Sequence, residues 1–475
     1  KKSNPHPTWK MAALTSVGVT YSGYLQKKGN MMWQQRWFEL HGDTLLYYND
    51  KGEKPRGELV LNATSTVGAL SNGDPVGFQV IFSGGKALKV KAPDAGSCEE
   101  WKAALHSVIH TVADLNSTLC PKTEETFVVP KKYAIKKKLG QGAYGCVAGG
   151  VDEEAGKQVA IKKVRNAFDD TTDAKRILRE IRLMRSLDHP CVLGLYDLVR
   201  PSSLEHFNDV YIVTTRMDQD LQSIVFSKTP LSEDQTQWII YQCLAGLNYL
   251  HSAGVAHRDL KPANLLIDLE SCDVKICDFG LSRVIEEDGP YGAAAEAQTL
   301  YVVTRWYRAP EVLLGYTHYD NGIDLWSLGC IFGELLHRRP LLNGENFVNQ
   351  LEKINDFVGT PPPEDLWYVT NEKARNFMLN VLPKRRGVDM AAKFPEASPE
   401  ALDLVKKLLD MNPKSRLDTA SALNHPYLAA VREAAEYECR APLTVNTDDI
   451  EALELTESNL KRMMFQEIMH FHDKR

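Results

Sequence analysis

Two short motifs, each with charged residues set among apolar ones, constrain this chain more than any other feature. "HRDLKPANLLI" brings Asp259, Lys261 and Asn264 together, and "CDFGLSR" follows with Asp278. An unpaired carboxylate in apolar surroundings is costly to desolvate, and a bound cation would remove that cost. Mg²⁺ prefers one or two carboxylate-type ligands together with phosphate oxygens and water. The motifs therefore predict a Mg²⁺ and phosphate site that uses Asn264 and Asp278.

A glycine-rich loop lies upstream of these motifs. In "LGQGAYGCV", Gly140, Gly142 and Gly145 lack a Cβ that would keep phosphate oxygens from the backbone N–H groups. The same spacing occurs in hairpin turns and at the start of Rossmann units, but a Rossmann glycine loop leads into a helix. Here "QVAIKKV", a predicted strand, follows. On it, Lys162 is either a lysine with its head in water or a phosphate ligand paired with Glu180, which borders the apolar face of a predicted helix.

In this order, the motifs resemble the signature sequence of the eukaryotic protein kinases. The resemblance gives a kinase domain over residues 131–428 and implies an α+β fold with two lobes. It implies an ATP- and Mg²⁺-dependent kinase, and the lysine at position 261 implies serine or threonine as the acceptor. The implied catalytic residues are Asp259, Lys261, Lys162 and Glu180. The implied ATP-binding residues are Leu139, Gly140, Gln141, Gly142, Ala143, Tyr144, Gly145, Cys146, Val147, Lys162, Thr214, Met217 and Asp220.

The resemblance also implies what each catalytic residue does. Lys162 would contact the α- and β-phosphates, held by an ion pair with Glu180. Asp259 would accept the proton of the substrate hydroxyl, and Lys261 would contact the γ-phosphate. Three further residues match positions that brace the surrounding loops: Glu311, Asp324 and Arg416.

More narrowly, "TRWYRAPE", "REIRLM" and the tail "LTESNLKRMMFQEIMHFH" resemble the mitogen-activated protein kinases. The resemblance implies that Thr299 and Tyr301 are paired activating phosphorylation sites and that residues 429–475 pack on the kinase as an extension. Each phosphate would bring about −1.5 to −2 charges. The alternative is a loop that is ordered without phosphate. The arginines expected to bind the phosphates are Arg179, Arg258, Arg283, Arg305 and Arg308.

Partners of the kinase part follow from the same resemblance. It implies protein substrates in which proline follows the acceptor serine or threonine. Leu300 stands where the common family members have Glu, Asp or Gly, which leaves open an upstream kinase or autophosphorylation as the activator. Glu433 and Glu436 match positions that dock basic partner motifs; the alternative is a solvated acidic helix face.

A β-rich region that ends in a helix, residues 19–112, precedes the kinase-like part. In "GFQVIFSGGKALKVKA", apolar and polar residues alternate around a Gly-Gly turn, which predicts a hairpin with one buried face. Residues 113–130 are polar with two prolines, and we interpret them as a linker. Three signals predict helix N-termini: Ser97 with Glu100, Ser232 with Gln235, and Ser398 before Pro399.

The front region resembles a pleckstrin homology (PH) domain in "SGYLQKK" and "MMWQQRWFELHGDTLLYY", with Trp101 at the position of the core tryptophan of the helix. Lys27 and Arg36 match basic positions that contact phosphoinositides in such domains, but Gln34 replaces a second basic residue. The resemblance implies weak binding of a phosphoinositide, a protein ligand, or packing on the kinase to inhibit it. The alternative functions for the whole chain are a catalytically weak kinase-fold scaffold or an adaptor driven by its PH domain.

Composition bounds the remaining classes. The 475 residues carry a net charge of −6, which gives no general reason to expect nucleic-acid binding. No apolar run approaches the length of a membrane span, and we see no leader. The nine cysteines have no zinc or C-x-x-C spacing and are expected to be reduced thiols. We therefore expect a cytoplasmic protein, with recruitment to a membrane surface through the PH domain as a further option.

Overall fold

The computed structural model describes residues 21–29, 32–62, 64–82, 85–142, 145–202, 204, 207–227, 230–284, 304–318, 320–434, 437 and 445–473. The chain divides into two compact units. The first comprises the residues up to Leu178, Leu195–Arg216 and the residues from Leu453 onward, and the second comprises Arg179–Gly194 and Met217–Ala452.

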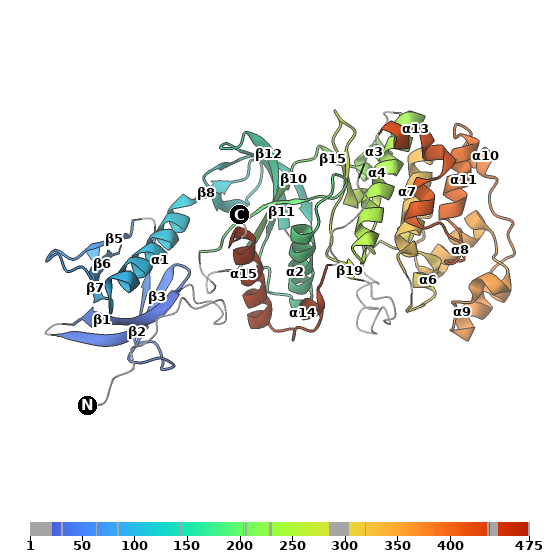
Figure 1. Ribbon diagram of the computed structural model, residues 1–475. Helices are drawn as coiled ribbons and strands as arrows, with labels where there is room; N and C mark the ends of the chain where they lie inside the picture. Colours follow the sequence, from blue (N-terminus) through green and yellow to red (C-terminus); the bar gives the residue numbers. More distant parts are fainter. Residues whose placement is uncertain are drawn as a thin grey trace. The chain divides into compact units, whose positions relative to one another are not determined.

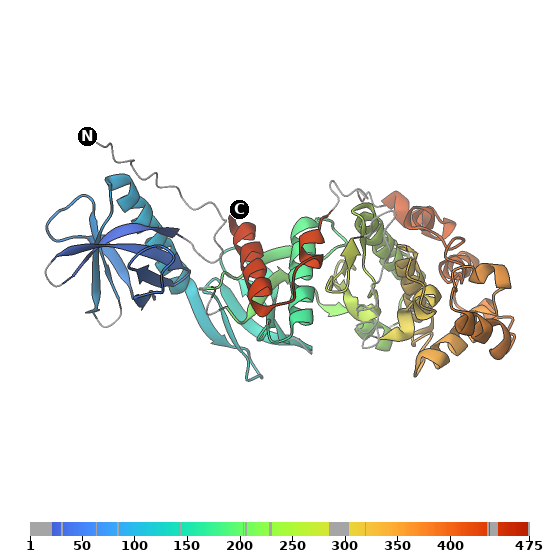
Figure 2. The ribbon, with the colours of Figure 1, turned by 90° about the horizontal axis from the view of Figure 1, so that it is seen from below.

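The first unit begins with an antiparallel sheet, drawn as the blue strands in Figure 2. It has seven strands in the order β4-β3-β2-β1-β7-β6-β5. Phe78 and Val80 on β6 are fully buried, and Phe78 lies opposite Val90 of β7. The predicted hairpin with one buried face is therefore confirmed. The strands are β1 (Tyr21–Lys28), β2 (Trp33–His41), β3 (Thr44–Tyr48), β4 (Gly57–Val60), β5 (Thr66–Ala69), β6 (Gly77–Ile81) and β7 (Ala87–Lys91).

Helix α1 (Ala95–Asp114) follows this sheet, and its Trp101 packs in the core of the sheet. The helix begins earlier than Ser97 and Glu100 predict. The carboxylate of Asp94, in an extended conformation, accepts a hydrogen bond of 2.8 Å from the Ser97 backbone N–H and is the N-cap. The prediction of Ser97 as the cap was wrong because an equally good capping residue stands three positions before it.

The predicted linker of residues 113–130 contains an ordered hairpin, β8 (Leu115–Leu119) and β9 (Thr126–Pro130). Phe127 and Val129 are fully buried in one core cluster with residues of a second, five-stranded sheet. The Lys163 ammonium also donates to the Thr126 carbonyl at 2.8 Å. The segment predicted as a linker is therefore folded, because alternating apolar residues in "TFVVP" bury one face of the hairpin.

This second sheet, called the kinase sheet below because it lies in the kinase-like part of the sequence, has five antiparallel strands in the order β10-β11-β12-β14-β13. In the same unit, helix α15 (Glu457–Asp473) packs Phe465 against Phe207, with ring centroids 6.2 Å apart. Helix α2 (Thr171–Ser186) buries Ile177, Ile181 and Met184, as predicted. The strands are β10 (Tyr133–Gly142), β11 (Gly145–Asp152), β12 (Lys157–Val164), β13 (Leu195–Leu198) and β14 (Val210–Thr215).

The second unit is mainly helical, and Figure 1 shows α4, α7 and α11 packed together at its centre. Ser232 caps α4 with a full capping box, and Ser398 caps α11 with proline at its first position, as predicted. The helices are α3 (Leu221–Phe226), α4 (Glu233–Ser252), α6 (Pro310–Leu313), α7 (Gly322–His337), α8 (Phe347–Val358), α9 (Glu372–Asn376), α10 (Met390–Lys393), α11 (Pro399–Leu408), α12 (Thr419–Leu423), α13 (Ala429–Ala434) and α14 (Asp448–Glu451).

Short strands and single turns of the second unit carry the loops of the candidate site. β17 (Leu265–Ile267) pairs with β15 (Gln219–Asp220) and β18 (Val274–Ile276), and β16 (Val255–Ala256) pairs with β19 (Arg283–Val284). The 3₁₀ turns are η2 (Pro262–Asn264), η3 (Arg305–Tyr307), η4 (Pro363–Leu366) and η6 (Pro426–Leu428), and η5 (Phe377–Val381) is a π-helical turn. Within the described residues, no helix is both long and apolar enough to cross a membrane.

Candidate active site

The loop between β16 and β17 brings Asp259, Lys261 and Asn264 together. The Lys261 ammonium lies 2.6 Å from Asp259 Oδ2, and the Asn264 amide donates to the Asp259 carbonyl at 2.9 Å and to Oδ2 at 3.2 Å. Burial raises the pKa of Asp259 above its ordinary value, and the charge of Lys261 opposes this rise. The carboxylate is thus oriented by two donors and has an increased affinity for a proton.

Asp324, at the start of α7, holds the backbone of this loop. Its buried carboxylate accepts from the backbone N–H groups of His257 at 2.8 Å and Arg258 at 2.9 Å and contacts His251 Nε2 at 3.0 Å. Burial opposes the charge on Asp324, but these bonds, led by the one to His251, keep its pKa below the ordinary value. Arg258 has φ of 67°, a strained conformation that the bonds to Asp324 stabilise.

The "CDFG" segment lies against the same loop. The Cys277 N–H donates to the Asn264 carbonyl at 3.0 Å, and His257 Nε2 lies 3.0 Å from the Cys277 carbonyl. Phe279 is fully buried and packs edge-on against the His257 ring, whereas Asp278 is exposed, with φ of 68°. The expectation of a buried Asp278 was wrong because the left-handed turn at this residue directs neighbouring side chains in different directions.

Asn264 and Asp278 fit a divalent cation only if a nucleotide and water supply further oxygen ligands. Asn264 uses its amide N–H groups on Asp259, and Asp278 presents its carboxylate to solvent. Among the described residues, no group of three or more His, Cys, Asp or Glu could hold a metal by itself. A Mg²⁺ ion at Asn264 and Asp278 would therefore need oxygens from a nucleotide and water.

The glycine-rich loop belongs to the first unit, where β10 pairs with β11. A Cβ on Gly145 would lie 1.8 Å from the Lys163 carbonyl oxygen, whereas at Gly140 and Gly142 it would meet nothing within 4 Å. Gly145 is therefore required by the packing of β11 on β12. The other two glycines leave open space, which is what a bound phosphate needs.

The other expected nucleotide-binding residues lie in both units. Lys162 is half-buried on β12, opposite Val147 and Ile212, and Thr214 is on β14. The others belong to the second unit, where Glu180 is buried on α2. Met217 is 8% exposed, and the Asp220 carboxylate caps α3 by accepting from the Ser223 N–H at 2.7 Å. Leu139, Gln141 and Cys146 lie on β10 and β11, while Ala143 and Tyr144 lie outside the described residues.

Three of the arginines expected to bind phosphate lie around one backbone segment, residues 280–282. Arg179 donates to the Gly280 carbonyl at 2.7 Å, and Arg258 and Arg283 both donate to the Leu281 carbonyl at 3.5 Å. Arg305 does not join them: it donates to the Glu345 carbonyl at 3.0 Å and lies over the Phe347 ring. Thr299 and Tyr301 lie outside the described residues.

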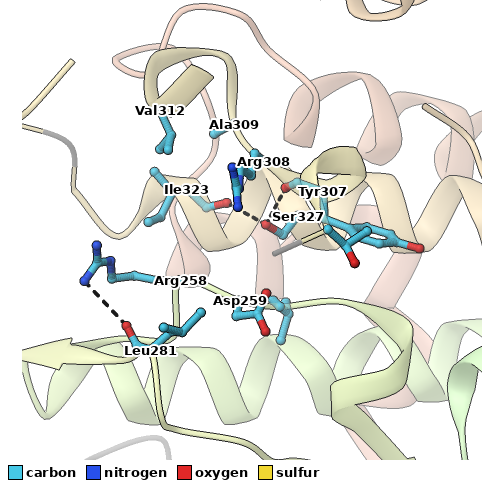
Figure 3. A pocket seen from close by; sticks show the side chains of 11 residues that line it. Arg258, Asp259, Leu281, Tyr307, Arg308, Ala309, Val312, Ile323 and Ser327 are labelled. Atoms are coloured by element: carbon cyan, nitrogen blue, oxygen red, sulfur yellow. Dashed lines mark hydrogen bonds between the residues drawn. The ribbon is translucent and has the colours of Figure 1, made fainter. Parts of the chain in front are cut away.

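A small pocket lies beside Asp259 in the second unit (Figure 3). Arg258 and Asp259 line one side, and Arg308 and Ala309 line the other. The Ser327 hydroxyl donates to the Tyr307 carbonyl at 2.7 Å, and this bond joins two other residues that line the pocket. The pocket therefore has charged side chains on both of these sides, next to Asp259.

Glu311, which stands in the chain between the pocket residues Ala309 and Val312, forms a buried bidentate ion pair with Arg416, with N–O distances of 2.6 and 2.9 Å. Glu311 is 1% exposed, and Arg416 also donates to the Gly322 carbonyl at 2.9 Å. The two residues thus tie the start of α6 to α7.

The remaining candidate binding residues are the basic residues of the front domain and the acidic residues near α13. Lys27 lies over the Tyr47 ring, 4.6 Å from its centroid, and Arg36 donates to Gln34 Oε1 at 2.8 Å. The strand register places Lys27 opposite Gln34. Glu433 is exposed on α13, and Glu436 lies outside the described residues.

Sequence reasoning missed two carboxylates, Asp449 and Glu451 of α14. They pair with Arg182 and Arg179 of α2, at 3.0 and 2.7 Å. The acidic run "DDIE" and the arginine-rich "RILREIRLMR" were the available signals, but nothing in the sequence pairs segments that are about 270 residues apart.

The first unit contains the glycine-rich hairpin and the strand with Lys162, and the second contains the Asp259 loop. This combination of elements is typical of a protein kinase. The family model "Protein kinase domain" matches residues 133–428, and "PH domain" matches residues 19–110.

Similar proteins identify which family of protein kinases the chain belongs to. Extracellular signal-regulated kinase 1 of Dictyostelium discoideum is 44% identical over 347 residues, 73% of this chain and 64% of that protein. Mitogen-activated protein kinase 1 of Oryza sativa subsp. japonica is 45% identical over 335 residues, 70% of this chain and 81% of that protein. Mitogen-activated protein kinase 6 of Arabidopsis thaliana is 44% identical over 335 residues, 70% of this chain and 82% of that protein. The chain belongs to the mitogen-activated protein kinases, which are ATP-dependent serine/threonine kinases, and carries an N-terminal PH domain.

Proposed function

We propose that this chain transfers the γ-phosphate of ATP to serine or threonine followed by proline in protein substrates. The observation that carries the proposal is the geometry of Asp259, which is hydrogen-bonded to Lys261 and Asn264 on a loop braced by Asp324. A carboxylate with a raised pKa can accept the hydroxyl proton of the substrate. Lys261 would neutralise charge on the transferred phosphoryl group.

In this proposal, Asn264 and Asp278 hold Mg²⁺, which supplies charge neutralisation on the phosphates when bound. Lys162, with Glu180, contacts the α- and β-phosphates. Thr214, Met217 and the backbone of the glycine loop bind the remainder of the nucleotide. The open space at Gly140 and Gly142 supports this assignment. Because its carboxylate already caps α3, Asp220 would contact the ribose only through its second oxygen.

Activation, in this proposal, is by phosphorylation of Thr299 and Tyr301, through an upstream kinase or autophosphorylation. Arg258 and Arg283 support it, since both guanidinium groups reach one backbone segment: each donates to the Leu281 carbonyl at 3.5 Å, and Arg283 also donates to the Ser282 carbonyl at 2.9 Å. A phosphate placed there would accept charge-assisted hydrogen bonds from both arginines.

For the PH domain, we propose recruitment of a cytoplasmic protein to an anionic membrane surface. Lys27 and Arg36 lie on neighbouring antiparallel strands, at positions two register steps apart. Each basic residue near such a surface contributes about 1 kcal/mol, so binding should be weak. Sedimentation of the full chain with phosphoinositide vesicles, against neutral vesicles, tests the proposal, and the Lys27→Ala/Arg36→Ala variant should pellet less.

The kinase proposal is tested with full-length chain, Mg²⁺-ATP and paired peptides that differ only in having Pro or Ala after the acceptor serine. We expect phosphorylation of the Pro peptide. Asp259→Asn should lower kcat about 10²- to 10⁴-fold and leave nucleotide binding intact. Asp273→Asn, at an exposed position, is the matched control. Equal turnover of both peptides would refute the substrate preference, and full activity of Asp259→Asn would refute the role of this residue.

A further inference from the structure

Two arginine–carboxylate pairs join α14, in the C-terminal extension, to α2. Arg179 donates from Nε to Glu451 Oε1 at 2.7 Å and from Nη2 to Oε2 at 3.1 Å. One turn further along α2, Arg182 donates to both oxygens of Asp449 at 3.1 and 3.0 Å. Both pairs are bidentate, the geometry that gives the strongest and most directional ion pairs.

Arg179 is the more constrained of the two arginines. It is 2% exposed, and its remaining terminal nitrogen, Nη1, donates to the Gly280 carbonyl at 2.7 Å. Glu451 therefore takes the edge of the guanidinium formed by Nε and Nη2, and Gly280 takes the other end. Three of the five guanidinium N–H donors are therefore in use, and a phosphate would have to reach the remaining two on a side chain that is 2% exposed.

In the sequence of α2, Glu180 lies between Arg179 and Arg182, the two arginines that pair with α14. Residues three apart share one face of a helix, so Arg179 and Arg182 meet α14 from the same face, and Glu180 extends from an adjacent face. Holding two points on one face fixes the rotation of α2 and thus the direction of Glu180. Through Gly280, the same arginine also holds the backbone two residues beyond Asp278.

We propose that Glu451 and Asp449 are positioning residues for the kinase reaction: Glu451 supplies to Arg179 the negative charge that the family resemblance assigns to phosphorylated Thr299, and both carboxylates set α2 and the Asp278–Gly280 segment. The inference rests on the proposed function, because it concerns how its catalytic groups are oriented. Phosphate on the activation segment then acts on Arg258 and Arg283, while Arg179 is held from within the chain.

The experiment compares Glu451→Gln and Asp449→Asn with Glu454→Gln, the same change at an exposed position three residues from Glu451. We expect Glu451→Gln to lower kcat at saturating Mg²⁺-ATP at least tenfold, with the peptide KM within twofold of wild type. Amide hydrogen exchange in residues 179–186 should be faster in this variant. Glu454→Gln should match wild type in both measurements.

A charge-reversed pair separates positioning from loss of fold. Arg182→Glu alone should lower kcat, and Arg182→Glu with Asp449→Arg should restore at least half of it, because the ion pair forms again in the opposite sense. An unchanged or higher kcat in Glu451→Gln would overturn the proposal, as would unchanged exchange in 179–186. Absence of any peptide phosphorylation by the wild-type chain would instead refute the proposed function, so the two failures are distinguishable.

Discussion

Replacement of Glu311 by glutamine probes the buried ion pair between Glu311 and Arg416. The side chain of Arg416 is fully buried, and that of Glu311 is 1% exposed. Both Glu311 oxygens accept from Arg416, at 2.6 and 2.9 Å. Glutamine keeps the size of the side chain but removes the charge that compensates the guanidinium.

Loss of one partner from a buried ion pair destabilises a protein by about 3–5 kcal/mol, because the other charge stays buried without compensation. The remaining bonds from Arg416 to the Gly322 and Asp410 carbonyls are to neutral groups and replace only part of this. We expect about 3 kcal/mol for Glu311→Gln. For a domain of this size, that corresponds to a fall in Tm on the order of 5–10 °C.

Scanning calorimetry and urea unfolding of the full chain measure this loss, with Glu345→Gln, at an exposed position, as control. The double variant Glu311→Leu/Arg416→Met should lose less stability than Glu311→Gln, because it leaves no buried charge. If Glu311→Gln unfolds within 0.5 kcal/mol of the control (roughly the scatter of neutral surface substitutions), the buried pair does not contribute as argued.

Three further predictions use other parts of the chain. Burial lowers the pKa of His189 to about 4. The stabilisation associated with the neutral ring is therefore complete above the unfolded pKa of about 6.5 and is lost as pH falls toward 4, by about 2 kcal/mol at pH 5. His189→Gln should make the free energy of unfolding, measured in urea, depend less on pH between 7 and 5, and an unchanged pH dependence would contradict this. Because the pKa of Asp259 is raised, the acid limb of the kcat–pH profile should lie above the ordinary aspartate value of about 3.9, and a limb at or below that value would count against Asp259 as the base. Gly145→Ala should lower Tm because its Cβ would meet the Lys163 carbonyl, whereas Gly142→Ala should leave Tm unchanged; equal Tm values for the two variants would refute the distinction.

Much of the candidate site could be predicted from local patterns. The Asp259 loop, the glycine-rich hairpin and the lysine strand are each a short continuous stretch of sequence. The residue types of each stretch and the spacing between them indicate its chemistry. The errors occurred where packing decided. Asp94 rather than Ser97 caps α1, and the stretch around Phe127 is a hairpin because the kinase sheet offers it an apolar face.

By itself, the sequence determined the class of this protein, because phosphoryl transfer needs particular residue types at short separations and those separations survive without any knowledge of the fold. The resemblance to kinases marked Glu311, Asp324 and Arg416 as bracing residues, but only the tertiary structure decided which partners they hold. Asp324 on the Arg258 backbone, Glu311 on Arg416 and Glu451 on Arg179 join segments 66 to 272 residues apart. Such pairs leave no periodic trace in the sequence, because a buried charge is paired by proximity in space and its partner can come from any distance along the chain.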